Sequence, residues 1–114
     1  MEMCIVEEAE KLKEKNNVLV VNPKKVSIES IRLAEKLAKN SFRERKNIAS
    51  SFCMEFALWL SGKTNISSAL AYLSPEKGAK ALLIDFNFKA NRLPKGLRKN
   101  ATWEEIEKIS LSRI

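Results

Sequence analysis

The chain has 114 residues, of which 45% are hydrophobic and 31% charged, and 21 lysines and arginines exceed 14 acidic residues to give a net charge of +7. This length and composition exclude a disordered chain and indicate one domain, residues 1–114, with a real core. With three glycines and three prolines, the sequence leaves little room for a turn-rich all-β fold. The positive charge suits a polyanionic partner such as nucleic acid, but it also serves solubility alone.

Several kinds of site and segment are not expected from this composition. The chain has no histidine, and its two cysteines, Cys4 and Cys53, lack the CxxC spacing of a metal site. The first residues do not resemble a signal peptide, and the longest apolar run, Phe56–Leu60, is too short to cross a bilayer. We therefore expect a cytoplasmic protein without metal, cofactor or membrane contact.

The first half of the chain predicts two strands and a helix. Cys4–Val6 and Val18–Val21 are short apolar runs typical of strands, and the charged segment between them, Glu7–Lys15, has a weak helical pattern. Ser27 is a good N-cap for a helix. The apolar face of that helix is expected at Ile28, Ile31, Ala34, Leu37 and Ala38.

The segment 47–62 predicts a helix that is too apolar for a protein surface. Its apolar side chains point in every direction, whereas a surface helix has a single apolar stripe. Asn47 is a plausible N-cap, and Gly62 is a plausible C-cap with a positive φ angle. We expect this helix to lie between other elements or under a partner protein.

The second half predicts another helix, a strand and a terminal helix. Asn65 can cap a helix whose apolar stripe is Ile66, Ala69, Leu70 and Leu73. After Val18–Val21, Ala79–Phe88 is the second clear strand candidate. A basic loop, 86–102, leads to Thr102-Trp-Glu-Glu105, which has the spacing of a capping box. Strands separated by helices indicate an α/β or α+β fold, in which helices cover a small mixed or antiparallel sheet of three or four strands.

Glu55 is the one carboxylate in the middle of the apolar helix, and it has two interpretations. A carboxylate with a shifted pKa can act in acid–base catalysis, or it can be held inside the fold by an arginine, a lysine, a hydroxyl or a backbone N–H. No second catalytic group keeps a recognisable spacing with Glu55, which favours the structural role. Glu55→Ala should then destabilise the fold by about 1–3 kcal/mol.

Gly62-Lys63-Thr64 resembles the end of a phosphate-binding P-loop. That motif needs a glycine at position 57, where this chain has alanine, and a strand before it rather than a helix. A small nucleotide-binding or transferase enzyme that uses Lys63 and Glu55 is therefore the alternative rather than the main interpretation.

Two segments match a known family at polar as well as apolar positions. They are 48–56 (Ile-Ala-Ser-Ser-Phe-Cys-Met-Glu-Phe) and 60–66 (Leu-Ser-Gly-Lys-Thr-Asn-Ile), followed by Ala69. This chain resembles the small regulatory subunit of the KEOPS complex, the PRPK-binding protein (TPRKB-like) family, in its archaeal type. The resemblance covers about residues 17–86 and is most specific over 47–69.

The resemblance implies a non-catalytic role in tRNA modification. KEOPS installs threonylcarbamoyl on the adenosine beside the anticodon, and its transferase subunit performs the chemistry. The small subunit binds the N-terminal lobe of a small atypical kinase that acts as an ATPase, and in archaea it captures the single-stranded 3′ CCA end of tRNA. The transferase subunit would be an indirect partner in the same complex. The resemblance also gives Glu55 and Gly62 structural roles.

The expected contacts fall into two sets. RNA contacts are expected around the two ends of the apolar helix, at Arg43, Arg45, Lys46, Asn47, Lys63, Thr64 and Asn65. The kinase is expected to dock on apolar side chains near the chain end, at Trp103, Ile109, Leu111 and Ile114. A purely structural adaptor without RNA contact remains a third possibility.

Overall fold

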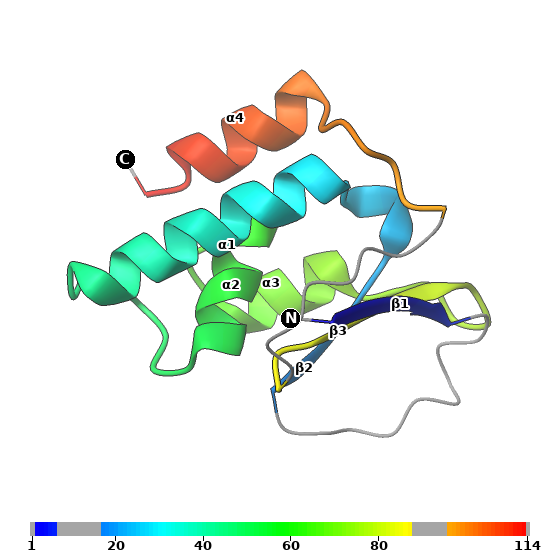
Figure 1. Ribbon diagram of the computed structural model, residues 1–114, viewed down its shortest axis with the longest axis horizontal. Coiled ribbons are helices and arrows are strands. Elements are labelled where there is room, and N and C mark those ends of the chain that lie inside the picture. The colour runs from blue at the N-terminus through cyan, green and yellow to red at the C-terminus, as the bar shows by residue number, and fades with distance from the viewer. Residues whose placement is uncertain (1, 7–16, 88–95, 114) are drawn as a thin grey trace.

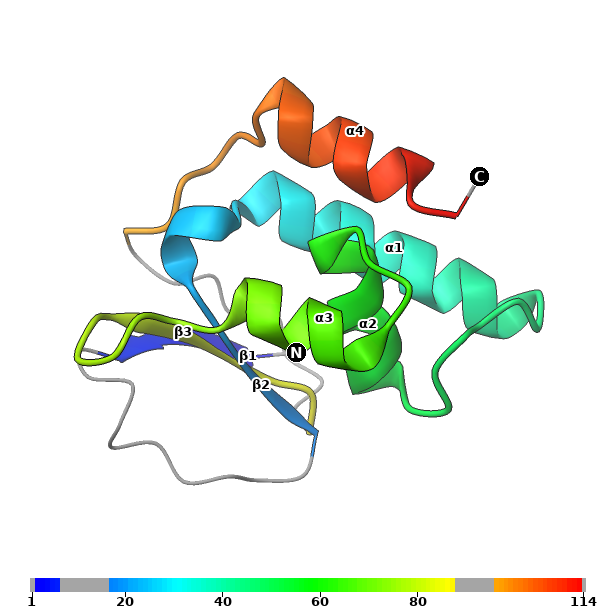
Figure 2. The same ribbon diagram turned by 180° about the vertical axis from the view of Figure 1, so that it is seen from behind.

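The computed structural model describes residues 2–6, 17–87 and 96–113, which form one α+β domain (Figure 1). The expected fold class is confirmed. Two views of the ribbon show α1, α2 and α3 on one side of the sheet, with α4 beyond α1 (Figures 1 and 2). The elements in chain order are β1 (Glu2–Val6), β2 (Val18–Val21), the 3₁₀ turn η2 (Pro23–Lys25), α1 (Ile28–Arg43), α2 (Phe52–Ser61), α3 (Ile66–Leu73), β3 (Ala81–Asp85) and α4 (Trp103–Leu111).

The sheet has three strands in the order β1-β3-β2, and both pairs are antiparallel. In the register, Ile84 of the central strand lies opposite Met3 on one side and Leu19 on the other. All three side chains are buried, because alternate residues of a strand point to the same face and this face is covered by the helices.

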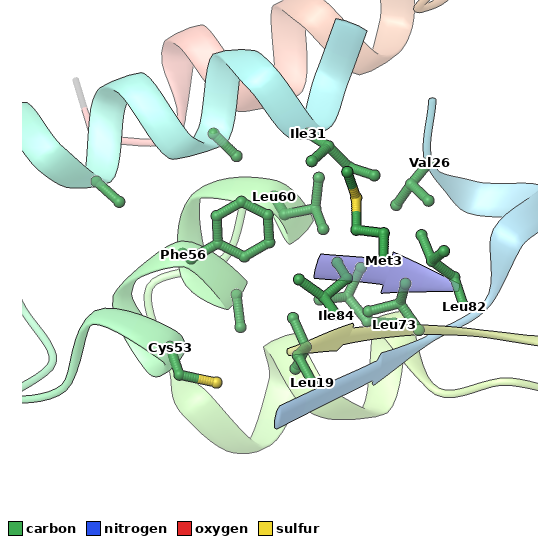
Figure 3. Close-up of a cluster of buried hydrophobic side chains, with 14 of the residues drawn as sticks. Met3, Leu19, Val26, Ile31, Cys53, Phe56, Leu60, Leu73, Leu82 and Ile84 are labelled. Atoms are coloured by element: carbon green, nitrogen blue, oxygen red, sulfur yellow. The ribbon is translucent and has the colours of Figure 1, made fainter. Parts of the chain in front are cut away.

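The main core lies between this face of the sheet and the helices (Figure 3). Phe56 and Leu60 of α2, together with Ile31 of α1, meet the sheet side chains there. Phe56 also packs edge-on against Phe86, with 5.1 Å between the ring centroids. Burial of these large side chains provides most of the driving force for folding.

The apolar helix α2 is in the middle of the domain, as its composition predicts. It packs against α1, α3, α4 and β2, so little of its surface faces solvent. Gly62 ends it in the left-handed conformation, with φ +70°. The predicted caps of three other helices are also confirmed: Ser27 caps α1, Asn65 caps α3 and Thr102 caps α4.

Three expectations need correction. The apolar helix begins at Phe52 and its N-cap is Ser51, so Asn47 is not the cap. The strand expected over Ala79–Phe88 is β3, which is shorter and covers Ala81–Asp85. In α3, half of the expected stripe is exposed: Ala69 and Leu73 are buried, whereas Ile66 and Leu70 face solvent. The segment Glu7–Lys15 and the centre of the basic loop, 88–95, lie outside the described residues.

Candidate functional site

A buried carboxylate holds together the segment that carries the family resemblance. Glu55 is fully buried, and its Oε2 atom accepts hydrogen bonds from Ser41 Oγ of α1 and from Arg113 Nη1 beyond α4, both at 2.6 Å. Its Oε1 atom accepts the backbone N–H groups of Ile48 and Ala49, each at 3.0 Å. One side chain therefore joins two helices, the loop before α2 and the segment after α4.

These contacts explain why α2 begins later than its composition indicates. In a helix that began after Asn47, Glu55 would lie six to seven residues, about 10 Å, along the axis from these two amides, too far for its carboxylate to reach them, so the loop turns back towards the side chain instead. Asn47 instead donates from Nδ2 to the Ala49 carbonyl at 2.8 Å, and Ser51 Oγ accepts the Met54 N–H at the helix start. Asn47 and Glu55 thus both bind the backbone of Ala49, and Ser51, the cap of α2, accepts the Glu55 N–H at its carbonyl oxygen.

The surroundings of Glu55 keep it ionised. Burial by itself raises the pKa of a carboxyl group. The hydrogen bonds from Arg113, Ser41 and the Ala49 amide, together with the charge of Arg113, outweigh this and lower the pKa of Glu55 from 4.5 to about 2. A buried carboxylate with a low pKa is a poor general base, because its lone pairs are already occupied and no substrate can reach it. The geometry favours the structural interpretation of Glu55.

We predict that this carboxylate makes the fold acid-sensitive. The unfolded chain binds a proton near pH 4.5 but the folded chain only near pH 2, so the stabilisation is complete above pH 4.5 and is lost as the pH falls towards 2. The loss should be on the order of 3 kcal/mol. Urea unfolding at several pH values measures it, and in Glu55→Gln this part of the pH dependence should disappear. An identical pH dependence in both proteins would contradict the low pKa.

Gly62 lies where two helices approach closely. A Cβ atom on this residue would overlap Lys108 Cγ of α4 and would lie 3.0 Å from the Lys108 carbonyl oxygen. The helix end therefore needs glycine for two reasons, the positive φ angle and the space.

We predict that Gly62→Ala lowers the free energy of unfolding by about 1–3 kcal/mol, through backbone strain and overpacking. Gly96→Ala is the matched control, because Gly96 also has a positive φ angle, +87°, but no atom within 4 Å of the added Cβ. Denaturant unfolding of both variants separates the two effects. Equal losses would show that Lys108 moves aside freely.

Lys63 belongs to a cationic cluster that the sequence does not reveal. The Nζ atoms of Lys108, Lys25 and Lys63 lie 3.8, 4.2 and 5.7 Å from the centre of the Tyr72 ring. We call these four residues the Tyr72 cluster. They come from η2, α3, α4 and the turn after α2, so their positions in the sequence give no common spacing. The ring stabilises the ammonium groups over it through cation–π contacts, and lysines gathered in one place attract phosphate groups.

The other predicted RNA-binding residues fall into two places. Arg43, Arg45 and Lys46 are exposed before α2, and Arg45 has a positive φ angle of +57°. At the opposite end of α2, Thr64 and Asn65 are exposed beside Lys63, and Asn65 Oδ1 accepts the Ser68 N–H as a cap. A helix of this length spans about 15 Å. Lys63 therefore lies with the other residues of the Tyr72 cluster, at the opposite end of α2 from Lys46.

The predicted partner-binding residues of α4 point in different directions. Trp103 and Leu111 are exposed, at 77% and 52% of their surface. Ile109 is only 1% exposed because it faces the interior of the domain, so its assignment as a surface contact is wrong. Ile114 lies outside the described residues. An exposed tryptophan at the start of a helix remains a good candidate for an interface.

No protein-family model matches this sequence, and no curated protein does either. Among the described residues there is no cluster of three or more side chains suited to hold a metal ion. No helix within the same residues is long and apolar enough to cross a membrane.

Proposed function

We propose that this chain is a non-catalytic regulatory subunit of a KEOPS-type tRNA-modifying complex. In this role it binds the small atypical kinase of the complex directly and captures the 3′ CCA end of tRNA, while the transferase subunit is an indirect partner. The basis is the sequence resemblance over residues 47–69, together with the way these residues fold.

One observation carries the proposal: the signature residues depend on one another physically. Glu55 binds the amides of Ile48 and Ala49, and Asn47 folds back on the Ala49 carbonyl. At the other end Ser61 Oγ accepts the Lys63 N–H, next to the left-handed Gly62. A chance match to an apolar helix would not require these polar positions. These mutual contacts, together with the resemblance, are the support for the proposed role.

The RNA part of the proposal uses the turn after α2. Lys63 lies beside Tyr72, Lys25 and Lys108, and such a group of lysines can bind a backbone phosphate. The exposed residues before α2, such as Arg45 and Lys46, would contact phosphates further along the strand. A single-stranded 3′ end presents phosphates that these lysines can neutralise.

The kinase part of the proposal uses the exposed face of α4, and it leads to a prediction. Trp103→Glu and Leu111→Glu should each weaken binding of the kinase subunit by about tenfold or more, since a charge would replace an apolar contact at the interface. Because both side chains are exposed, the domain should remain folded. The measurement is calorimetric titration of the kinase subunit with each purified variant.

Leu70→Glu is the control, since it places the same charge on an exposed apolar position of α3. It should leave kinase affinity unchanged. If the α4 variants bind at full affinity while Leu70→Glu does not, the kinase contacts α3 instead. If the unmodified chain does not bind the kinase at all, the proposed function is wrong.

A further inference from the structure

Three buried hydrogen-bond donors of two side chains, one on α2 and one after α4, have no acceptor in the part of the chain that the structure describes. They are Arg113 Nε, Arg113 Nη2 and Trp59 Nε1. Buried donors are nearly always paired, so three in one place indicate a missing acceptor. The two residues are in contact, with the guanidinium carbon of Arg113 4.0 Å from the centre of the Trp59 ring.

The unpaired atoms of Arg113 form the edge that binds oxyanions. In a guanidinium group the N–H bonds of Nε and Nη2 are parallel and lie on one side, which is the geometry that holds two oxygens of one ligand. Glu55 occupies only Nη1, at 2.6 Å. The ion pair therefore fixes the arginine from one end and leaves its two-pronged edge without an acceptor among the described residues.

Both residues line a surface cavity of about 410 Å³. The cavity is large enough for a small organic molecule. Its charges are balanced, because Glu55 pairs with Arg113, and Glu44 lies 4.0 Å from Lys46. The lining residues are Leu37, Asn40, Ser41, Glu44, Lys46, Trp59 and Arg113.

We propose that this cavity binds a carboxylate group, which accepts hydrogen bonds from Nε and Nη2 of Arg113 and from the Trp59 indole. A singly charged ligand fits the balanced charges better than a doubly charged phosphate. The parallel Nε and Nη2 donors of Arg113 match the two oxygens of a carboxylate. The carboxylate can come from a free small acid or from an acidic side chain of a protein.

The test is an NMR titration of the full chain with sodium acetate, read at the indole N–H signal of Trp59. Sodium chloride at the same ionic strength is the reference. The sequence has two tryptophans, so the Trp103→Phe background leaves one indole signal. We expect a saturable shift with acetate and none with chloride. Arg113→Lys, which keeps the charge beside Glu55, should weaken acetate binding about tenfold, while Arg32→Lys on the exposed side of α1 should not.

Two further ligands show whether the carboxylate comes from a free acid or from a protein side chain, and whether the cavity prefers a carboxylate to a phosphodiester. A blocked peptide, acetyl-Gly-Glu-Gly-amide, tests the protein side chain against free acetate; binding of either supports the proposal, and the tighter one identifies the source. Dimethyl phosphate represents a phosphodiester. If dimethyl phosphate binds more tightly than both carboxylates, or if acetate gives no saturable shift, the proposal is wrong. Trp59→Phe, followed at the backbone amide of Asn40, gives an independent check and should also weaken binding.

Discussion

Replacing Glu55 with glutamine is expected to lower the free energy of unfolding by about 3–5 kcal/mol. This exceeds the 1–3 kcal/mol that an unpaired hydrogen bond alone implies. The substitution removes the counter-ion of Arg113, whose side chain is only 14% exposed, and it weakens the contacts to Ser41 and to two backbone amides. The free energy of unfolding of a native protein is about 5–15 kcal/mol, so a large part of the stability depends on one side chain.

Equilibrium unfolding in urea at pH 7 measures this loss. Glu35→Gln is the matched control, because Glu35 forms a more exposed pair with Lys39 one helical turn away, at 3.4 Å. That change should alter stability by no more than about 0.5 kcal/mol. If Glu55→Gln and Glu35→Gln unfold at the same urea concentration, Glu55 does not have the central role that its contacts indicate.

The sequence alone predicts the parts of the fold that depend on local chemistry. Caps such as Ser27, Asn65 and Thr102 act on amides a few residues away, so their spacing is visible in the sequence. Gly62 is recognisable in the sequence as a helix C-cap, because that role also depends on residues close to it in the chain. The central position of α2 is predicted because a helix that is apolar on all sides must be covered.

Other features depend on pairs that are distant in the sequence, and these were not predicted. Arg113 reaches Glu55 across 58 positions, and nothing in the sequence distinguishes it from the other basic residues. The helix α2 begins later than the sequence predicts, because the loop before Ser51 turns back to place two amides on the Glu55 carboxylate. The Tyr72 cluster joins four separate segments, so only the folded structure reveals it.

The proposed RNA contact leads to the second prediction with a large effect. Lys63→Glu should weaken binding of tRNA by about tenfold or more, because it places a negative charge beside the phosphates and beside Tyr72. Lys36→Glu on the exposed side of α1 is the matched control and should have a much smaller effect. Affinity should also fall with salt, at a slope of about −0.7 for each phosphate that is neutralised. Equal losses for Lys63→Glu and Lys36→Glu would indicate a diffuse basic surface.

The most direct measurement of the proposed role compares two RNAs, an intact tRNA and the same tRNA without its terminal CCA, in gel-shift titrations with this chain. Removal of CCA should weaken binding by about tenfold or more, because the single-stranded end would provide the contacted phosphates. Equal affinity for the two RNAs would contradict the capture of the 3′ end by this chain.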